Sequence, residues 1–179
     1  MIKRKSWEIK EDLIVGELMQ LLKITPKECM ILKSLQSEAQ SVSLDLVDDY
    51  YARLMEHEET NEYITNLTAL KSTLAKWFTE LFCGNYDRHY ALDRLRIGMA
   101  HVRIGLPVRY PLAMFAILAR YGEMVTKGKG EEATEAFRKV LALDVATFTQ
   151  AYDNTQLNHL SDLIGGSEPL ARRLLSDEF

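Results

Sequence analysis

The sequence has few residues that break helices and few that form cross-links. Its 179 residues include only four prolines and two cysteines. No run shows the strict alternation of apolar and polar residues between turn signals that marks a half-buried strand. Apolar residues instead recur at helical spacing almost throughout. The fold class is therefore predicted to be all-α.

The two cysteines, Cys29 and Cys83, do not suggest a disulfide framework. A chain of this size in a reducing compartment needs no disulfide for stability. A free cysteine in such a chain is commonly a small buried hydrophobic residue. We interpret both cysteines in this way.

Long apolar runs and an excess of positive charge are also missing. The net charge is −4 at pH 7, so no broad basic field attracts a phosphate backbone, and the basic start at 3–5 is too short to change this. Charged residues at 8, 10, 11 and 12 interrupt the N-terminal region where a signal peptide would be apolar, and no later stretch approaches the length of a bilayer span. We expect a cytoplasmic protein with no nucleic-acid or membrane partner.

The composition fits one folded domain, with 47% hydrophobic and 27% charged residues. Thr25, Pro26 and Glu28 form the pattern of a capping box with proline at the first helical position. Gly84 stands where a helix would end. The apolar periodicity predicts helices over 7–22, from 26 onward, and over 43–57, 68–82, 87–104, 107–125 and 131 to beyond 160.

The stretch from Ile97 to Pro107 centres on His101. On a helix, His101 is flanked by Ile97, Gly98, Ile104 and Gly105, an apolar and shallow setting that suits a flat macrocycle. A neutral imidazole there could bind iron and donate its other N–H to a carbonyl one turn back. The pattern alone nevertheless favours a structural histidine, because a lone helical histidine is more often structural.

The stretch from Ile97 to Pro107 resembles the proximal-helix signature of globin-coupled sensors. The similarity includes the run 70–72 ahead of Trp77 and the run 49–51 upstream, and it covers about 44–149. This resemblance implies a globin-like fold that encloses a b-type haem, with an extra N-terminal helix. Covalent attachment of the haem is not expected, because the sequence has no Cys-x-x-Cys-His motif.

The resemblance also implies roles for three residues. His101 aligns with the proximal iron ligand, Tyr51 with the distal tyrosine and Leu70 with the distal position of the next helix. The pattern alone does not choose between Tyr51 and its neighbour Tyr50, and the choice of Tyr51 comes from the resemblance. A phenol in an apolar pocket would stabilise bound oxygen through a hydrogen bond. Leucine cannot coordinate iron, so the sixth position should be open to a gas.

Further haem contacts are expected among apolar residues near these positions, although such residues are usually plain core. Arg94 is a candidate partner for a haem propionate, with a solvated surface arginine as the alternative. His57, His89 and His159 are not expected to be ligands. The candidate haem contacts are Leu74, Phe78, Ile97, Met99, Ile104, Tyr110 and Met114.

Together these features predict a gas sensor, with residues 1–160 as the globin sensor domain and 161–179 as a linker towards a missing output domain. Oxygen is the expected ligand, with CO and NO as further candidates, and the expected output is a C-terminal module such as a diguanylate cyclase. The resemblance implies a homodimer through the last two long helices, at 110–125 and 137–148. The chain itself is not expected to be an enzyme. The alternatives are a free-standing sensor globin, a catalytic globin that removes nitric oxide, and a haem-free interaction module of globin shape.

Overall fold

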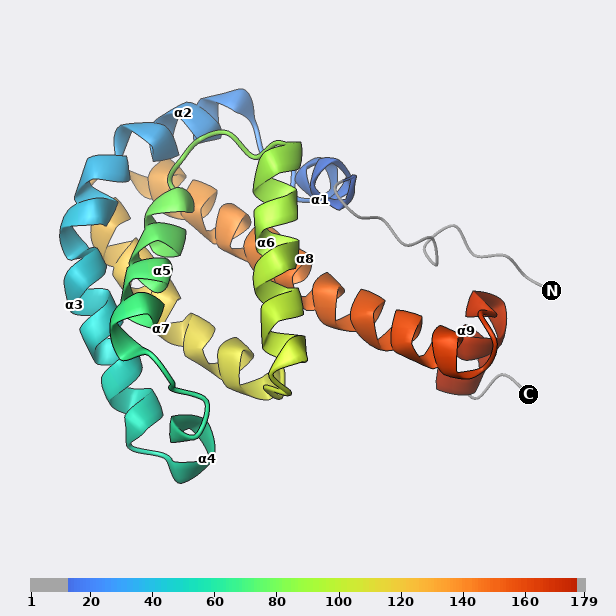
Figure 1. Ribbon diagram of the computed structural model, residues 1–179. Helices are drawn as coiled ribbons and strands as arrows, with labels where there is room; N and C mark the ends of the chain where they lie inside the picture. The colour runs from blue at the N-terminus through green and yellow to red at the C-terminus, as the bar shows by residue number, and fades with distance from the viewer. Residues whose placement is uncertain (1–12, 177–179) are drawn as a thin grey trace.

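The structure is a computed structural model that describes residues 13–176. Every regular element in this part of the chain is a helix, which confirms the all-α prediction (Figure 1). The helices are α1 (Ile14–Leu21), α2 (Pro26–Ser34), α3 (Gln36–Met55), α4 (Glu58–Asn61), α5 (Leu67–Glu80), α6 (Arg88–Arg103), α7 (Arg109–Thr126), α8 (Glu131–Leu163) and α9 (Glu168–Ser176). None of these helices is long and apolar enough to cross a membrane.

The start of α2 follows the predicted capping box. The Thr25 side chain accepts a hydrogen bond from the backbone N–H of Glu28, and the Glu28 carboxylate accepts one from the backbone N–H of Thr25 at 2.7 Å. By contrast, α3 begins at Gln36 rather than at Ser43. Its first turns bury little besides Ala39, so the apolar periodicity gave no signal there.

The first helix differs from the predicted amphipathic pattern. Residues 7–12 of the predicted helix lie outside the described residues, and α1 begins at Ile14. Ile14 and Val15 are buried, but Leu13 and Leu21, which belong to the apolar periodicity of the predicted helix over 7–22, are each 74% exposed. Among the described residues, α1 packs mainly on α6 and α8, so a narrow apolar stripe is buried.

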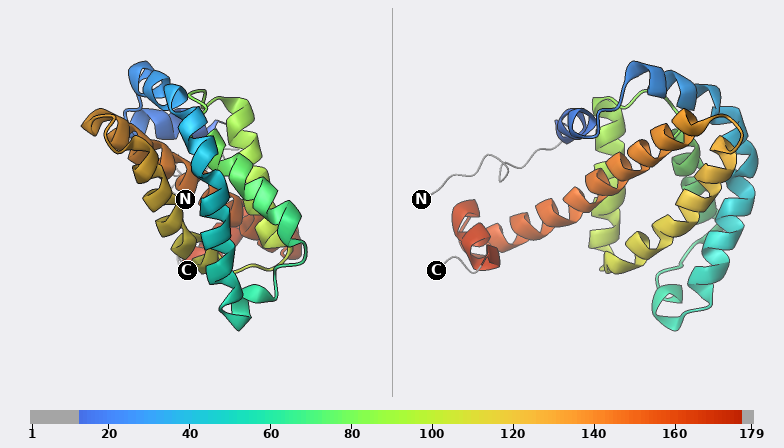
Figure 2. Two further views of the ribbon diagram at one scale, coloured as in Figure 1. Left: turned by 90° about the vertical axis from the view of Figure 1, so that its left-hand side faces the viewer. Right: turned by 180° about the vertical axis from the view of Figure 1, so that it is seen from behind.

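The long helix α8 forms the spine on which the others pack. It contacts α1, α2, α6, α7 and α9, while α3 packs against α5 and α7. The C-terminal half of α8 projects from the body, and α9 folds back against its end (Figures 1 and 2). The predicted boundary at residue 160 therefore falls inside a continuous helix. The backbones of α5 and α6 do not pack closely together, which leaves room between them.

Gly98 lies at the crossing of α6 and α8. A Cβ at this position would stand 2.5 Å from the Cβ of Ala151 and 2.7 Å from the carbonyl oxygen of Phe148. The glycine therefore permits a close helix crossing, and it does not make room for a macrocycle as the sequence suggested. Gly105, with φ +72°, has open space around it and follows the end of α6.

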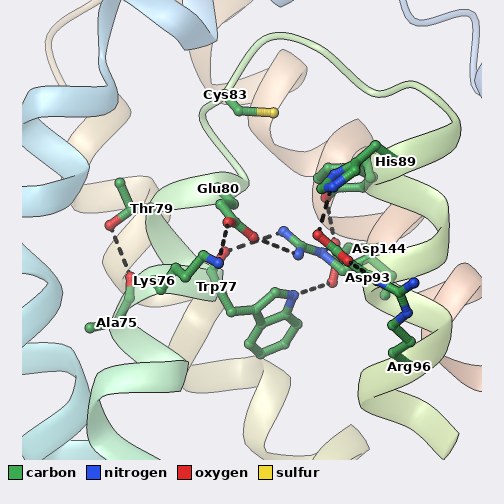
Figure 3. Close-up of polar contacts among 12 residues, drawn as sticks. Ala75, Lys76, Trp77, Thr79, Glu80, Cys83, His89, Asp93, Arg96 and Asp144 are labelled. Carbon is green, nitrogen blue, oxygen red and sulfur yellow. Dashed lines mark hydrogen bonds and ion pairs between the residues drawn. The ribbon is translucent and has the colours of Figure 1, made fainter.

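A buried polar cluster joins α5, α6 and α8 (Figure 3). The side chains of Arg94 and Asp144 are 1% and 0% exposed, and the Arg94 Nε lies 2.6 Å from Asp144 Oδ1. A second Arg94 nitrogen donates to Glu80 at 2.8 Å. Trp77 Nε1 donates to Asp144 Oδ2 at 2.9 Å, and the Tyr90 hydroxyl donates to the same carboxylate.

This cluster overturns the expectation that Arg94 binds a haem propionate. The guanidinium is enclosed by its two carboxylate partners and lies 4.2 Å from the centroid of the Tyr90 ring. A buried charge is stable only when it is paired in this way. Arg94 therefore links α6 to α5 and α8. The sequence could not show this, because Asp144 is fifty residues away along the chain.

Replacing Asp144 by asparagine should strongly destabilise the fold. The amide keeps the volume but leaves the buried Arg94 without its main counter-charge, and breaking such a pair costs about 3–5 kcal/mol of unfolding free energy. Urea denaturation of wild type and Asp144→Asn measures the difference. The control is Glu123→Gln, which breaks the exposed pair with Arg138 and should cost less than about 1 kcal/mol. Equal small losses in both variants would show that the cluster does not support the fold.

Candidate functional site

Two adjacent cavities lie in the space bordered by α3, α5, α6 and α7. We call them the inner cavity, with about 560 Å³ of empty space, and the outer cavity, with about 520 Å³, both partly open to solvent. The residues that line both cavities are Tyr50, Tyr51, Leu70, His101 and Pro111.

His101, near the C-terminal end of α6, is oriented by its own helix. Its Nδ1 lies 2.7 Å from the carbonyl oxygen of Ile97, and the edge of the ring meets Phe148 with 5.4 Å between ring centroids. A carbonyl can only accept, so Nδ1 carries the proton and donates, which leaves the lone pair on Nε2. Burial lowers the pKa of His101, although the Ile97 bond opposes this effect. The imidazole is therefore neutral and fit to coordinate a metal.

The number of metal-binding side chains near His101 shows whether a bare metal ion or a haem iron fits the site. In the described residues no cluster of three or more histidine, cysteine or acidic side chains could hold a metal ion. One imidazole cannot hold a bare ion, which needs several protein ligands. It can hold iron that already has four ligands from a macrocycle. A single oriented histidine between apolar cavities therefore fits a haem.

Two tyrosines from α3 supply hydroxyl groups at these cavities. The rings of Tyr50 and Tyr51 meet edge to face with 5.4 Å between centroids. Burial raises the pKa of Tyr51 to about 12. Burial, together with Tyr51 and Tyr152, also raises the pKa of Tyr50. Both phenols therefore stay protonated at neutral pH, and the geometry alone does not choose between them.

The structure brings most of the other candidate haem contacts to the cavities. Leu70 and Leu74 of α5 and Ile97 of α6 line the inner cavity. Ile104 and Tyr110, on either side of the α6–α7 turn, line the outer cavity. These residues come from separate helices and converge around His101.

Phe78, Met99 and Met114 are not among the residues that line either cavity. Phe78 is fully buried against Phe82, with 5.7 Å between ring centroids. Met99 is 44% exposed because it lies two positions from His101, on another face of α6. Met114 is half-buried and packs against the core. Residue type and proximity in sequence suggested these three contacts. Helical phase accounts for the place of Met99, whereas Phe78 is taken up by core packing.

Sequence reasoning missed several lining residues. Trp77 continues the Leu70 and Leu74 stripe of α5, and Phe115 lies one turn after Pro111, so helical spacing could have identified both. Phe148 comes from α8, and nothing local in the sequence signals its place. The outer cavity adds Leu54, Thr60, Tyr63, Ile64 and Leu106.

The remaining histidines lie away from the cavities, in agreement with the sequence. His89, at the start of α6, has a side chain that is 82% exposed and stands 3.4 Å from Asp93. His57 and His159 are also exposed. His101 is therefore the only histidine in the cavity linings.

Comparison with known proteins gives the same fold and family. The Protoglobin family model matches residues 12–158. The heme-based aerotactic transducer HemAT of Halobacterium salinarum is 32% identical over 154 residues, which cover 74% of this chain and 31% of the transducer. The chain thus spans about a third of the length of that relative.

Two solved structures are also similar. The globin domain of the Geobacter sulfurreducens globin-coupled sensor superimposes with a TM-score of 0.71 at 27% identity, over 76% of this chain and 96% of that one. The ferrous globin domain of E. coli DosC gives 0.56 at 16% identity, over 78% and 95%. This second similarity concerns the fold alone. The chain therefore belongs to the Protoglobin family and is a globin domain of the globin-coupled sensor type.

Proposed function

We propose that this chain is a haem-based oxygen sensor domain that controls a C-terminal signalling output. The observation that carries the proposal is His101, a neutral imidazole held by Ile97 at the junction of two cavities. Its Nε2 is available as the single protein ligand to the iron of a b-type haem. The apolar residues of α5 and α6 would cover the two faces of the macrocycle.

Each cavity residue has a distinct role in this proposal. Haem iron supplies reversible binding of a diatomic gas at an open coordination position. Leu70 cannot fill that position, and its bulk keeps water out. Tyr51 is the proposed donor to the gas, and its buried phenol discriminates in favour of oxygen, which accepts a hydrogen bond better than CO does. CO and NO are further ligands that such a site would accept.

The relatives support sensing rather than catalysis. The Halobacterium protein is a heme-based aerotactic transducer, and the Geobacter domain belongs to a globin-coupled sensor. Since this chain spans 31% of the transducer, the output that it controls is part of the proposal. We propose a module such as a diguanylate cyclase, joined through the projecting half of α8, α9 and the residues that follow.

Replacing Tyr51 by phenylalanine should speed the release of oxygen. Loss of one hydrogen bond to a partly charged ligand raises the dissociation rate about tenfold. Stopped-flow mixing of the oxygenated protein with excess CO measures this rate. Tyr50→Phe is the matched control, because the two rings are adjacent, and it should release oxygen at the wild-type rate. Acceleration in Tyr50→Phe alone would move the donor role to Tyr50, and failure of the wild type to bind oxygen reversibly would contradict oxygen sensing.

We also propose that the domain acts as a homodimer, as the resemblance to globin-coupled sensors implies. In α8, Phe137 and Phe148 are buried in the protomer itself and are not available to a partner. In α7, however, Leu112, Ala116 and Met124 are exposed along one row of four-residue spacing, whose remaining member is the exposed Arg120. Such a row forms the ridge that packs into the groove of another helix. The dimer contact is therefore proposed to centre on α7.

Met124→Glu should weaken this dimer. The glutamate would place a charge in an apolar contact, so sedimentation velocity should show a shift from dimer towards monomer at equal concentration. Leu44→Glu on α3 is the control, because Leu44 is also highly exposed, at 69%, but lies on another helix. A wild type that sediments as a monomer at high concentration, or a control that dissociates equally, would contradict an α7 interface.

A further inference from the structure

A haem carries two carboxylates, and they must lie where its cavity meets solvent or a cation. The inner cavity offers no free cation, since Arg94 is paired with Asp144 and Glu80. The one threonine that lines the inner cavity, Thr73, donates its hydroxyl hydrogen to the carbonyl of Ala69. The carboxylates are therefore not accommodated at the inner end.

Two tyrosines with hydroxyls in exposed contacts, Tyr63 and Tyr110, line the outer cavity, and we call this part of it the mouth. Tyr63 comes from the segment between α4 and α5, and its hydroxyl donates to the carbonyl of Gly105 at 3.4 Å. Tyr110 comes from the first turn of α7. Both residues line the outer cavity, so the turn after α6 and the segment before α5 meet there.

Arg109 stands beside this mouth and carries a charge without a carboxylate partner. Its guanidinium donates to the Tyr110 hydroxyl at 3.2 Å and lies 4.6 Å from the centroid of the Tyr110 ring. Among residues 13–176 no acidic group stands within ion-pair distance of it. Arg53 and Arg120 differ in this respect, because both pair with Asp49.

The electrostatic surroundings of Tyr63 show which charges meet at the mouth. Burial raises the pKa of Tyr63, the neighbouring Glu62 raises it further, and Arg109 opposes the increase. The Tyr63 phenol therefore interacts electrostatically with both the Glu62 carboxylate and the Arg109 guanidinium. An anion that enters here gains from Arg109 and is opposed by Glu62.

We propose that Arg109 binds a haem carboxylate at the mouth of the outer cavity, with the Tyr110 hydroxyl as an additional donor. This inference rests on the proposed haem site at His101. A planar guanidinium matches a carboxylate with two parallel hydrogen bonds. The tyrosine ring under the guanidinium positions it before the ligand arrives. Glu62 is the residue that weakens this site.

Haem loss measures the contribution of this contact directly. Ferric haem-loaded protein, as the full chain, is mixed at low salt with excess apomyoglobin, and the first-order transfer rate is followed by absorbance. Arg109→Gln should lose haem about fivefold faster than wild type, as expected for one partly exposed charged hydrogen bond. Glu62→Gln should lose haem more slowly, because it removes a like charge. High salt should reduce both effects.

Two controls separate a carboxylate contact from a general change in the protein. Iron protoporphyrin IX dimethyl ester has no carboxylates, so Arg109→Gln and wild type should release it at equal rates. Arg103→Gln removes an exposed charge two positions after His101 and should leave haem loss unchanged. Equal haem loss in Arg109→Gln and wild type, equal acceleration with the ester, or an effect on Arg103→Gln instead would overturn the inference.

The outcome also distinguishes this inference from the proposed function. A haem-loaded protein with a normal Soret band and no Arg109 effect would contradict the carboxylate contact and leave the sensor site in place. Failure of the chain to take up haem would contradict the proposed function, and the inference would fall with it.

Discussion

The position of α6 on α8 is the constraint on which the site depends. Gly98 lets the two backbones meet, and a side chain there would collide with Ala151. Asp144 of α8 then holds Arg94 of α6 and Trp77 of α5 through buried hydrogen bonds. Buried polar groups that satisfy one another in this way specify one arrangement of helices. Within that arrangement, Leu70 and Leu74 of α5 and Ile97 and His101 of α6 line the inner cavity.

In the proposed sensor, the chemistry of the site follows from having one metal ligand rather than several. If His101 is the single protein ligand, the group that it binds must bring its own ligands. The other residues of the pocket would then act on the gas and on the rim of the macrocycle. Tyr51 and Leu70 serve the gas side in the proposed sensor. Arg109 would contact the rim of the macrocycle. A charge there loses little hydration free energy, because solvent is near. In this account, His101 and Arg109 would determine the affinity for haem, and Tyr51 and Leu70 the selectivity for the gas. Gly98 and Arg94 make the contact of α6 with α8.

Local sequence patterns predicted most of the helices and drew attention to His101, but they did not predict the contacts between helices. The Thr25 capping box and the end of the helix predicted over 87–104 are short-range features; the box is formed, and α6 ends at Arg103, shortly before Gly105. The roles of Gly98 and Arg94 depended on α8, about fifty residues away, so the sequence alone led to the wrong partners. Met99 shows a different limit, because closeness to His101 along the chain says nothing about which face of the helix a side chain occupies. The resemblance to globin-coupled sensors supplied what the pattern could not, namely a reason to prefer a ligand role for His101.

The central claim is that His101 alone holds the iron, and chemical rescue of His101→Gly tests it most directly. Removal of the side chain leaves a space that free imidazole can enter. We predict that His101→Gly binds haem weakly, with an altered Soret band, and that added imidazole restores the wild-type spectrum of the reduced protein and of its CO complex. A His101→Gly protein that binds haem as tightly as wild type, with the same spectra in the absence of imidazole, would contradict the account.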